Sequence, residues 1–160
     1  MDMGVGSLVI VALLSFSAFS GRSFAALTNY TELDARSRNA LDLLSRDVRR
    51  SSRLVSYTPQ RIELADGAGV RTVYAFDATG RTLSRIRGGQ TDELLTGVDW
   101  LRFLIFQRTP VGGTYEYFPV TVGVATAKVV QIDWICSRSI LGARQNTESV
   151  QSAKIILRSK

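Results

Sequence analysis

The first fifty residues contain no proline, and they change from an uncharged half to an amphipathic half with no strong turn signal between the two. Residues 4–19 read GVGSLVIVALLSFSAF, and the first cation after them is Arg22. The next proline is Pro59. A long segment without prolines, apolar first and periodic afterwards, favours a continuous helix. We therefore predict one helix from about residue 4 to about residue 54, roughly 75 Å long at 1.5 Å per residue.

The second half of this helix carries an apolar stripe and paired charges. Ser37 and Ala40 lie between larger apolar residues that recur near helical spacing, so this half is expected to pack against a sheet. Acidic residues precede basic residues by four positions, the favourable order on a solvated helix face. The predicted packing residues are Leu33, Leu41, Leu44 and Val48. The predicted ion pairs are Glu32 with Arg36, Asp34 with Arg38 and Asp42 with Arg46.

A helix of this length exceeds the diameter of a 160-residue globule, so part of it must protrude. The protruding part is the uncharged half, and a water-soluble monomer would not expose such an apolar segment to solvent. We expect it to lie in a membrane or against copies of itself, where small residues let helices approach closely. The residues expected to form one contact face are Leu8, Ile10, Leu14, Phe16, Phe19 and Phe24.

Three interpretations of the apolar block compete. A secretory signal peptide needs a basic start, and residues 1–3 carry no cation, which argues against it. Residues 18–20 would nevertheless be an acceptable cleavage site for a signal peptidase. A plain membrane anchor needs about 20 apolar residues, and residues 4–19 are fewer. The third interpretation, which we favour, is that the apolar block is longer in the natural protein.

Beyond residue 54 the apolar period changes from 3.6 to 2, and turn residues appear. This pattern predicts five to seven mostly antiparallel strands, so the expected fold class is α+β: a long helix whose second half packs on one antiparallel sheet. Residues 88–89 should end the first group of strands, and residues 139–149 should form a polar loop. The expected strands are 61–65, 71–76, 82–87, 98–108, 115–118, 129–137 and 154–158.

The composition excludes several kinds of site. Histidine is absent, which we take to exclude both a zinc site and a Ser-His-Asp triad. Cys136 is the only cysteine, so the chain has no internal disulfide, and its place in an alternating strand predicts a buried thiol. Carboxylates such as Asp42 and Asp47 are interpreted as solvated charges. We therefore expect no enzyme activity, no catalytic or metal-binding residue, no cofactor and no small-molecule substrate.

The net charge of +6 comes from 20 Lys and Arg against 14 Asp and Glu. A basic balance can favour nucleic acid or an anionic membrane. Here the arginines are scattered, and no basic stripe with interleaved aromatic residues is present. The sequence argues against nucleic acid as the main partner.

Residues 38–49, RNALDLLSRDVR, follow the apolar helix in a manner that resembles type IV pilin-like proteins, above all W-type minor pilins and the J-type minor pseudopilin of type II secretion. The closing AKIILRSK also resembles the last strand of that family. The family's peptidase motif, a Gly followed by Phe-Thr-Leu-x-Glu, has no counterpart here, so the role of its glutamate cannot be assigned to Asp2.

This resemblance implies a filament subunit made of an apolar membrane or filament-core helix (1–22) and a head (23–160), the head comprising the helix half 23–54 and the sheet 55–160. It also implies insertion in the inner membrane with the head in the periplasm, followed by assembly with other pilin-like subunits into a periplasmic or extracellular filament. Two alternatives remain open. One is a membrane-tethered binding module that does not polymerise, and the other is a secreted enzyme with a cleaved leader.

Overall fold

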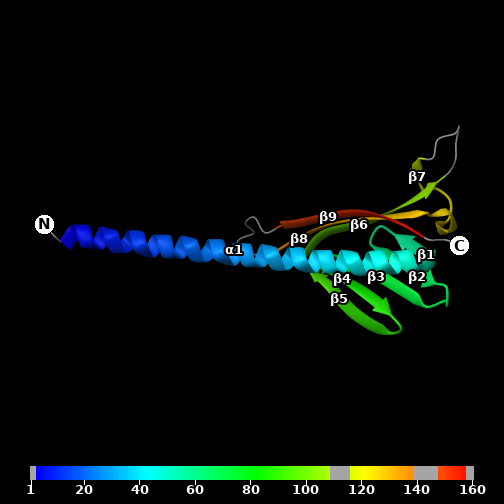
Figure 1. The fold of residues 1–160 in the computed structure, drawn as a ribbon, viewed down its shortest axis with the longest axis horizontal. Helices are drawn as coiled ribbons and strands as arrows, with labels where there is room; N and C mark the ends of the chain where they lie inside the picture. The colour runs from blue at the N-terminus through cyan, green and yellow to red at the C-terminus, as the bar shows by residue number, and fades with distance from the viewer. Residues whose placement is uncertain (1–2, 109–115, 139–147, 158–160) are drawn as a thin grey trace.

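The computed structural model describes residues 3–108, 116–138 and 148–157, and for residues 3–9, 22, 25, 26 and 148 it describes the backbone alone. The chain forms one long helix followed by nine strands in two antiparallel sheets. The N-terminal part of the helix extends beyond the strands, and its C-terminal part lies along them (Figure 1).

Helix α1 spans Met3–Arg50, or about 72 Å. It ends four residues earlier than the sequence suggests, because the next residues pair as a strand. Ser51 donates its hydroxyl proton to the carbonyl oxygen of Val48 at 2.6 Å, which satisfies one of the last helical carbonyls. Arg49 and Arg50 occupy the last turn, where cations interact favourably with the helix dipole.

Sheet A is a meander of five strands in the order β1-β2-β3-β4-β5. Its β4–β5 hairpin turns at Gly88 and Gly89, which have φ of 59° and 83°. A two-residue turn with positive φ at both positions is the type that glycine favours. The prediction that these glycines end the meander is therefore wrong, since β5 follows them directly. The strands are β1 Ser51–Thr58, β2 Arg61–Asp66, β3 Arg71–Asp77, β4 Thr82–Arg87 and β5 Gln90–Thr96.

Sheet B has four strands in the order β7-β6-β8-β9. The last strand begins at Glu148, so it is longer than the predicted strand 154–158, and the predicted loop 139–149 overlaps its start; residues 139–147 and 158 lie outside the described residues. The strands are β6 Val98–Arg108, β7 Tyr117–Pro119, β8 Val129–Ser137 and β9 Glu148–Ile156, with a short 3-10 helix, η1, at Val124–Thr126.

The predicted fold class, a helix packed on one sheet, is wrong because the strands divide into two sheets. The division occurs at Gly97, between β5 and β6. Gly97 has φ of 70°, and a Cβ there would lie 2.6 Å from the carbonyl oxygen of Ser137. Ser137 in turn donates its backbone N–H to the Gly97 carbonyl at 2.9 Å. Glycine thus lets the chain turn sharply beside β8, so that β6 pairs with β8 and not with β5.

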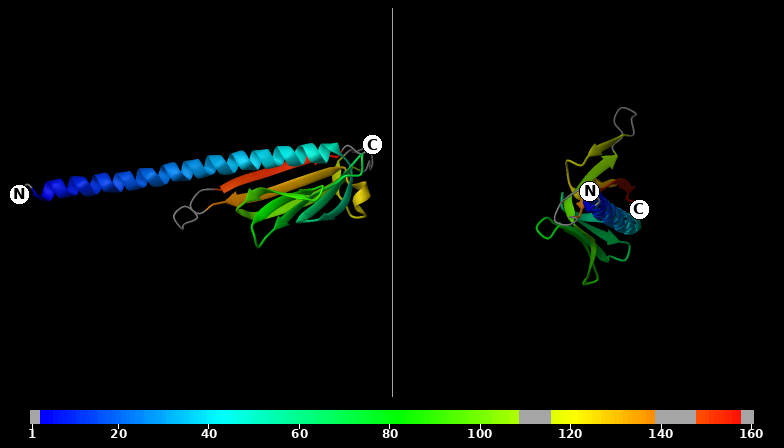
Figure 2. Two further views of the ribbon diagram at one scale, coloured as in Figure 1. Left: turned by 90° about the horizontal axis from the view of Figure 1, so that it is seen from below. Right: turned by 90° about the vertical axis from the view of Figure 1, so that its left-hand side faces the viewer.

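The core lies between the C-terminal half of α1 and the two sheets (Figure 2). The largest fully buried side chains are Trp134 from β8, Tyr74 from β3 and Phe103 from β6. Tyr57 links the sheets by donating its hydroxyl to the Phe103 carbonyl at 3.0 Å. The head is therefore one packed unit built on one half of the helix.

Candidate functional site

The part of α1 that extends beyond the head exposes its apolar side chains. We call residues 10–27 of α1 the stem. Its eight large apolar side chains are each between 59% and 71% exposed, whereas Leu33, farther along the same helix, is 2% exposed. These eight are Ile10, Val11, Leu13, Leu14, Phe16, Phe19, Phe24 and Leu27. Single exposed apolar residues are ordinary, but a continuous exposed apolar segment marks an interaction surface.

Large apolar side chains lie all around the stem, which also contains Arg22. Successive residues are about 100° apart around a helix, so Phe16 and Phe19 point away from Leu14. Ile10 and Phe24 lie on the same side as Leu14, and the side chain of Leu8 lies outside the described residues. The predicted contact residues therefore do not form a single face. A helix that is hydrophobic all round is normally surrounded by other apolar groups.

The helix half inside the head carries a narrow buried stripe. Leu33, Leu44 and Val48 are buried in the core, and Leu41 is half-buried at its margin. Of the predicted ion pairs, Glu32–Arg36 and Asp34–Arg38 form at 2.8 and 2.9 Å. Asp42 and Arg46 make no ion pair with each other in the described part of the chain.

Ser37 lies on this stripe and joins the helix to sheet B through polar contacts. It accepts a hydrogen bond from Trp134 Nε1 at 3.4 Å, and the Ser149 hydroxyl lies 3.4 Å from its own. Cys136 is fully buried in the same region. Burial raises the pKa of the Cys136 thiol to about 11. The thiol is thus held neutral, as expected for a small core residue and not for a nucleophile.

Asp47 joins the helix to sheet A, and its interpretation as a solvated charge is wrong. Its carboxylate is 6% exposed and lies 2.8 Å from Arg85 Nε and 3.7 Å from Arg87 Nη1. Tyr74 donates its hydroxyl to the same carboxylate at 2.7 Å. Burial first, and then this hydrogen bond to Asp47, raises the pKa of Tyr74. The burial of Asp47 could have been predicted from the sequence, because Asp47 lies three residues after Leu44 and this spacing places it on the buried stripe of the helix.

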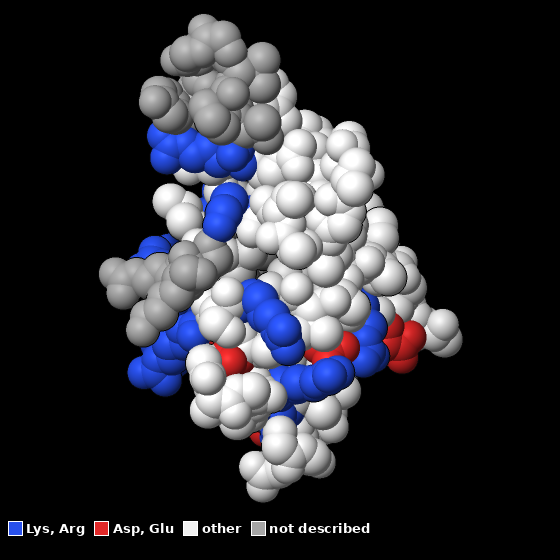
Figure 3. Space-filling view, turned by 90° about the vertical axis from the view of Figure 1, so that its right-hand side faces the viewer, with Lys and Arg blue, Asp and Glu red and all other residues white. Residues whose placement is uncertain are grey.

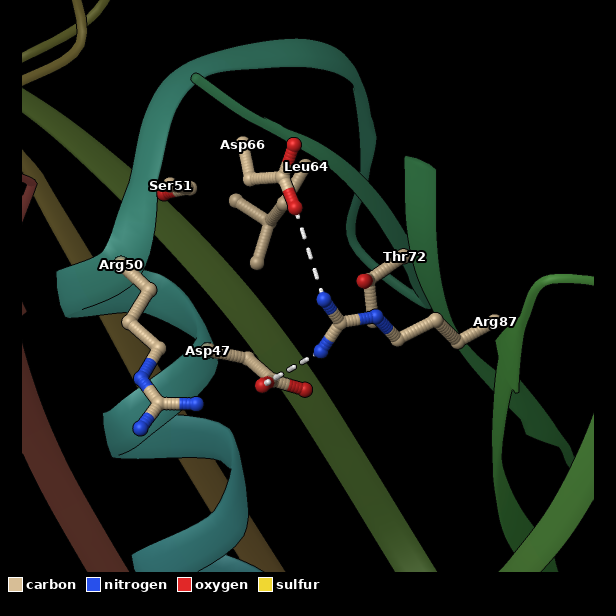
Figure 4. A pocket seen from close by; sticks show the side chains of 7 residues that line it. All are labelled: Asp47, Arg50, Ser51, Leu64, Asp66, Thr72 and Arg87. Atoms are coloured by element: carbon tan, nitrogen blue, oxygen red, sulfur yellow. Dashed lines mark hydrogen bonds and ion pairs between the residues drawn. The ribbon is translucent and has the colours of Figure 1, made fainter. Parts of the chain in front are cut away.

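Arg87 extends this network to the turn after β2. It contacts Asp47 on one side and Asp66 at 3.4 Å on the other, across a very small pocket (Figure 4). Arg50 and Thr72 also line that pocket. Its lining charges are mostly engaged with one another, so the arrangement holds the helix end to the sheet and leaves little room for a ligand.

The end of the head opposite the stem is basic. Figure 3 shows more Lys and Arg than Asp and Glu on this face. Arg49, Arg50 and Arg53 are exposed near the end of the helix and the start of β1. Cations here complement the negative end of the helix dipole, which accounts for part of this charge without a ligand.

The described residues offer little for catalysis. Within residues 3–108, 116–138 and 148–157, no group of three or more His, Cys, Asp or Glu side chains is arranged to hold a metal ion. An open groove of about 320 Å³ lies between α1 and β5, lined in part by Asn39, Leu43 and Leu94. It carries Arg36 and Glu93 at its sides, but no nucleophile with an adjacent base.

As far as the chain is described, no helix combines the length and the hydropathy needed to cross a membrane. The predicted location in the inner membrane stays a prediction.

No family model matches the chain, and no curated protein matches its sequence. The resemblance to pilin-like proteins therefore stays a prediction that rests on residues 38–49, the apolar block and the closing strand.

Proposed function

We propose that the chain is a structural subunit of a filament of the type IV pilus or type II secretion pseudopilus kind, and that it assembles through its stem. The observation that carries this proposal is the exposure of eight large apolar side chains around the stem, none of which belongs to the hydrophobic core of the head. The resemblance of residues 38–49 to pilin-like proteins supports the same assignment.

Burial of the stem, first in the membrane and then in the filament, keeps its apolar side chains out of water. Moving one Leu, Ile or Phe side chain out of water contributes about 1.5–3 kcal/mol. Once the stem is in an apolar environment, close packing of its small residues against neighbouring stems drives association. Because large apolar side chains lie all around the stem, it can contact several neighbours at once, as a helix in the centre of a bundle does.

The head has no catalytic role in this proposal. Asp47 and Ser37 tie the C-terminal half of the helix to sheets A and B, so the stem continues from a helical segment that is fixed to the head. In this proposal a continuous helix lets each stem place its head at a defined position on the filament surface. Before assembly the subunit would reside in the inner membrane with its head in the periplasm, as the family resemblance implies.

The test is the substitution Leu14→Arg in the full chain. A cation inside a dry helix contact costs about 3 kcal/mol, which corresponds to more than a hundredfold loss of association. The matched control is Val122→Arg, which places the same charge at an apolar head residue that is 75% exposed. Filaments sheared from cells, counted by electron microscopy and immunoblotting, should disappear with Leu14→Arg and persist with Val122→Arg.

Normal incorporation of the Leu14→Arg protein would contradict the proposal. A wild-type protein that stays monomeric in every fraction would instead support the alternative of a tethered binding module that does not polymerise.

A further inference from the structure

The head half of α1 borders an open groove. Strand β5 is at one edge of sheet A, and the groove of about 320 Å³ lies between this strand and the helix. Ala40, Leu43 and Leu94 contribute apolar side chains to the groove, whereas Arg36 and Glu93 contribute charges. Apolar groups with charged groups at their margin are the usual composition of a surface that receives another polypeptide.

Glu93 brings an unpartnered carboxylate to this groove. Its side chain is exposed and has no hydrogen-bond or ion-pair partner among the described residues. Arg36, the cation of the groove, contacts Glu32 at 2.8 Å instead. The neighbouring Asp92 is held by Arg85 at 3.2 Å. A cation that another molecule brings into the groove would therefore find a free carboxylate at Glu93.

The stem carries a cation for which its own helix offers no partner. Arg22 is the only charged residue between positions 4 and 27. Side chains three and four positions away on a helix are neighbours, and positions 18, 19, 25 and 26 hold Ala, Phe, Ala and Ala. The next acid along the helix is Glu32, about 15 Å away. Because an isolated cation is costly in an apolar helix contact, a filament of these stems needs a carboxylate from a second copy.

Neighbouring copies in a filament have to be displaced along its axis. Packed helices lie about 8–10 Å apart, whereas the head is much wider than the helix (Figure 2). Parallel stems can therefore pack closely over a long filament only if successive heads lie at different levels. With such a displacement, the stem of one copy runs beside the head half of α1 in another copy, where the groove lies.

We propose that the stem of one copy lies in the groove between α1 and β5 of a second copy, with Arg22 of the first copy paired to Glu93 of the second. Phe19 lies three positions before Arg22 on the same side of the helix, so it enters the groove beside Leu43 and Leu94. This inference rests on the proposed function, because it requires parallel stems in one filament.

The pair sets the displacement between the two copies. Residues 36–43 of α1 line the groove, so Arg22 of one copy lies level with a point about 14 to 21 residues farther along the other helix. At 1.5 Å per residue, the displacement is about 21–32 Å. The contact joins the stem of one copy to the head of the next, so it uses two different surfaces. A heterologous contact of this kind propagates without closing, as a filament requires.

Charge reversal in the full chain tests the pair. Arg22→Glu and Glu93→Arg should each lower the yield of sheared filaments at least about tenfold, because each variant places like charges together. The double variant Arg22→Glu/Glu93→Arg restores the pair with opposite signs, so its yield should return to within about threefold of the wild type.

The matched control combines Arg22→Glu with Asp42→Arg. Asp42 is also exposed, lies on the head half of α1 and has no side-chain partner in the described part of the chain. This combination should assemble as poorly as Arg22→Glu alone. Rescue by Asp42→Arg in place of Glu93→Arg would overturn the assignment of Glu93.

Cysteines at the two positions test the contact without charge. In the Cys136→Ala background, Arg22→Cys/Glu93→Cys removes both partners together, which is nearly neutral for assembly. Mild oxidation of assembled material should give a ladder of disulfide-linked oligomers. Within one copy the two positions are at least about 20 Å apart along the helix axis, too far for a disulfide. The control pair Arg22→Cys/Val122→Cys, with a cysteine at an exposed position elsewhere on the head, should give at least about ten times less product.

Two outcomes separate this inference from the proposed function. Wild-type filaments together with normal assembly of Arg22→Glu, or with a double variant no better than the single ones, would overturn the inference and leave the proposed function intact. Absence of filaments in the wild type would overturn the proposed function and the inference with it.

Discussion

Removal of the buried carboxylate that ties α1 to sheet A should destabilise the head by about 3 kcal/mol. Asp47 is 6% exposed and is bound by Arg85, which is 13% exposed, and by Tyr74, which is fully buried. Breaking a buried pair at one partner costs about 3–5 kcal/mol, because the other charge stays buried alone. Arg85 keeps a second partner in Asp92 at 3.2 Å, so the lower end of that range applies to Asp47→Ala.

The magnitude is measured by urea unfolding of the full chain in mild detergent, followed by tryptophan fluorescence. Asp42→Ala is the control, because Asp42 is exposed on the same helix; it should change the free energy of unfolding by less than about 0.5 kcal/mol. Tyr74→Phe alone should cost about 1 kcal/mol. In the Asp47→Ala background the same change should cost nearly nothing, since the hydroxyl has already lost its acceptor.

Two results would contradict a buried network around Asp47. If Asp47→Ala were as stable as Asp42→Ala, the carboxylate would not be held in a buried network. If Asp47→Ala and Tyr74→Phe were simply additive, the hydrogen bond between them would not contribute to stability.

Two further predictions concern the junction of the sheets and the buried thiol. Gly97→Ala should destabilise the head by about 2 kcal/mol or more, because Gly97 combines a φ of 70° with a close contact to the backbone oxygen of Ser137. Gly89→Ala should cost only about 1 kcal/mol, because Gly89 has a φ of 83° but open space around it. Equal losses of stability in urea unfolding would contradict the close contact at Gly97. Burial raises the pKa of the Cys136 thiol to about 11 in the folded protein, from 9.0 in the unfolded chain. As the pH rises, the unfolded chain therefore loses the thiol proton first. The contribution of Cys136 to the free energy of unfolding should be complete below about pH 9 and be lost towards pH 11. Native protein at pH 8 should react with a thiol reagent only as fast as it unfolds, and rapid labelling would show that the thiol is accessible.

Local patterns in the sequence located several strands closely, because these strands carry alternating side chains between glycine turns. The expected strands 71–76 and 82–87 correspond to β3 and β4, and 129–137 has the bounds of β8. β5, which reads QTDELLT, was missed because its first four residues are all exposed and show no alternation. β1 was missed because its serines and arginine resemble the end of the preceding helix.

The division into two sheets could not be read from local patterns. It depends on Gly97, whose conformation matters only because Ser137, forty residues later in the chain, lies against it. The contact of Asp47 with Arg85 and Tyr74 is equally remote in sequence. The spacing from Leu44 could have placed Asp47 on the buried stripe, although its carboxylate was interpreted as solvated; only the fold shows which cation and which hydroxyl meet it there.

In the proposed filament, stems of neighbouring copies contact one another. This contact can be probed with Leu14→Cys in the Cys136→Ala background, with a short thiol-to-thiol crosslinker applied to full-length protein in its assembled state. The proposal predicts dimers and higher covalent species with Leu14→Cys and only monomer with Val122→Cys, which lies on the head. Leu14→Cys that reacts fully with the reagent yet stays monomeric would contradict stem-to-stem assembly.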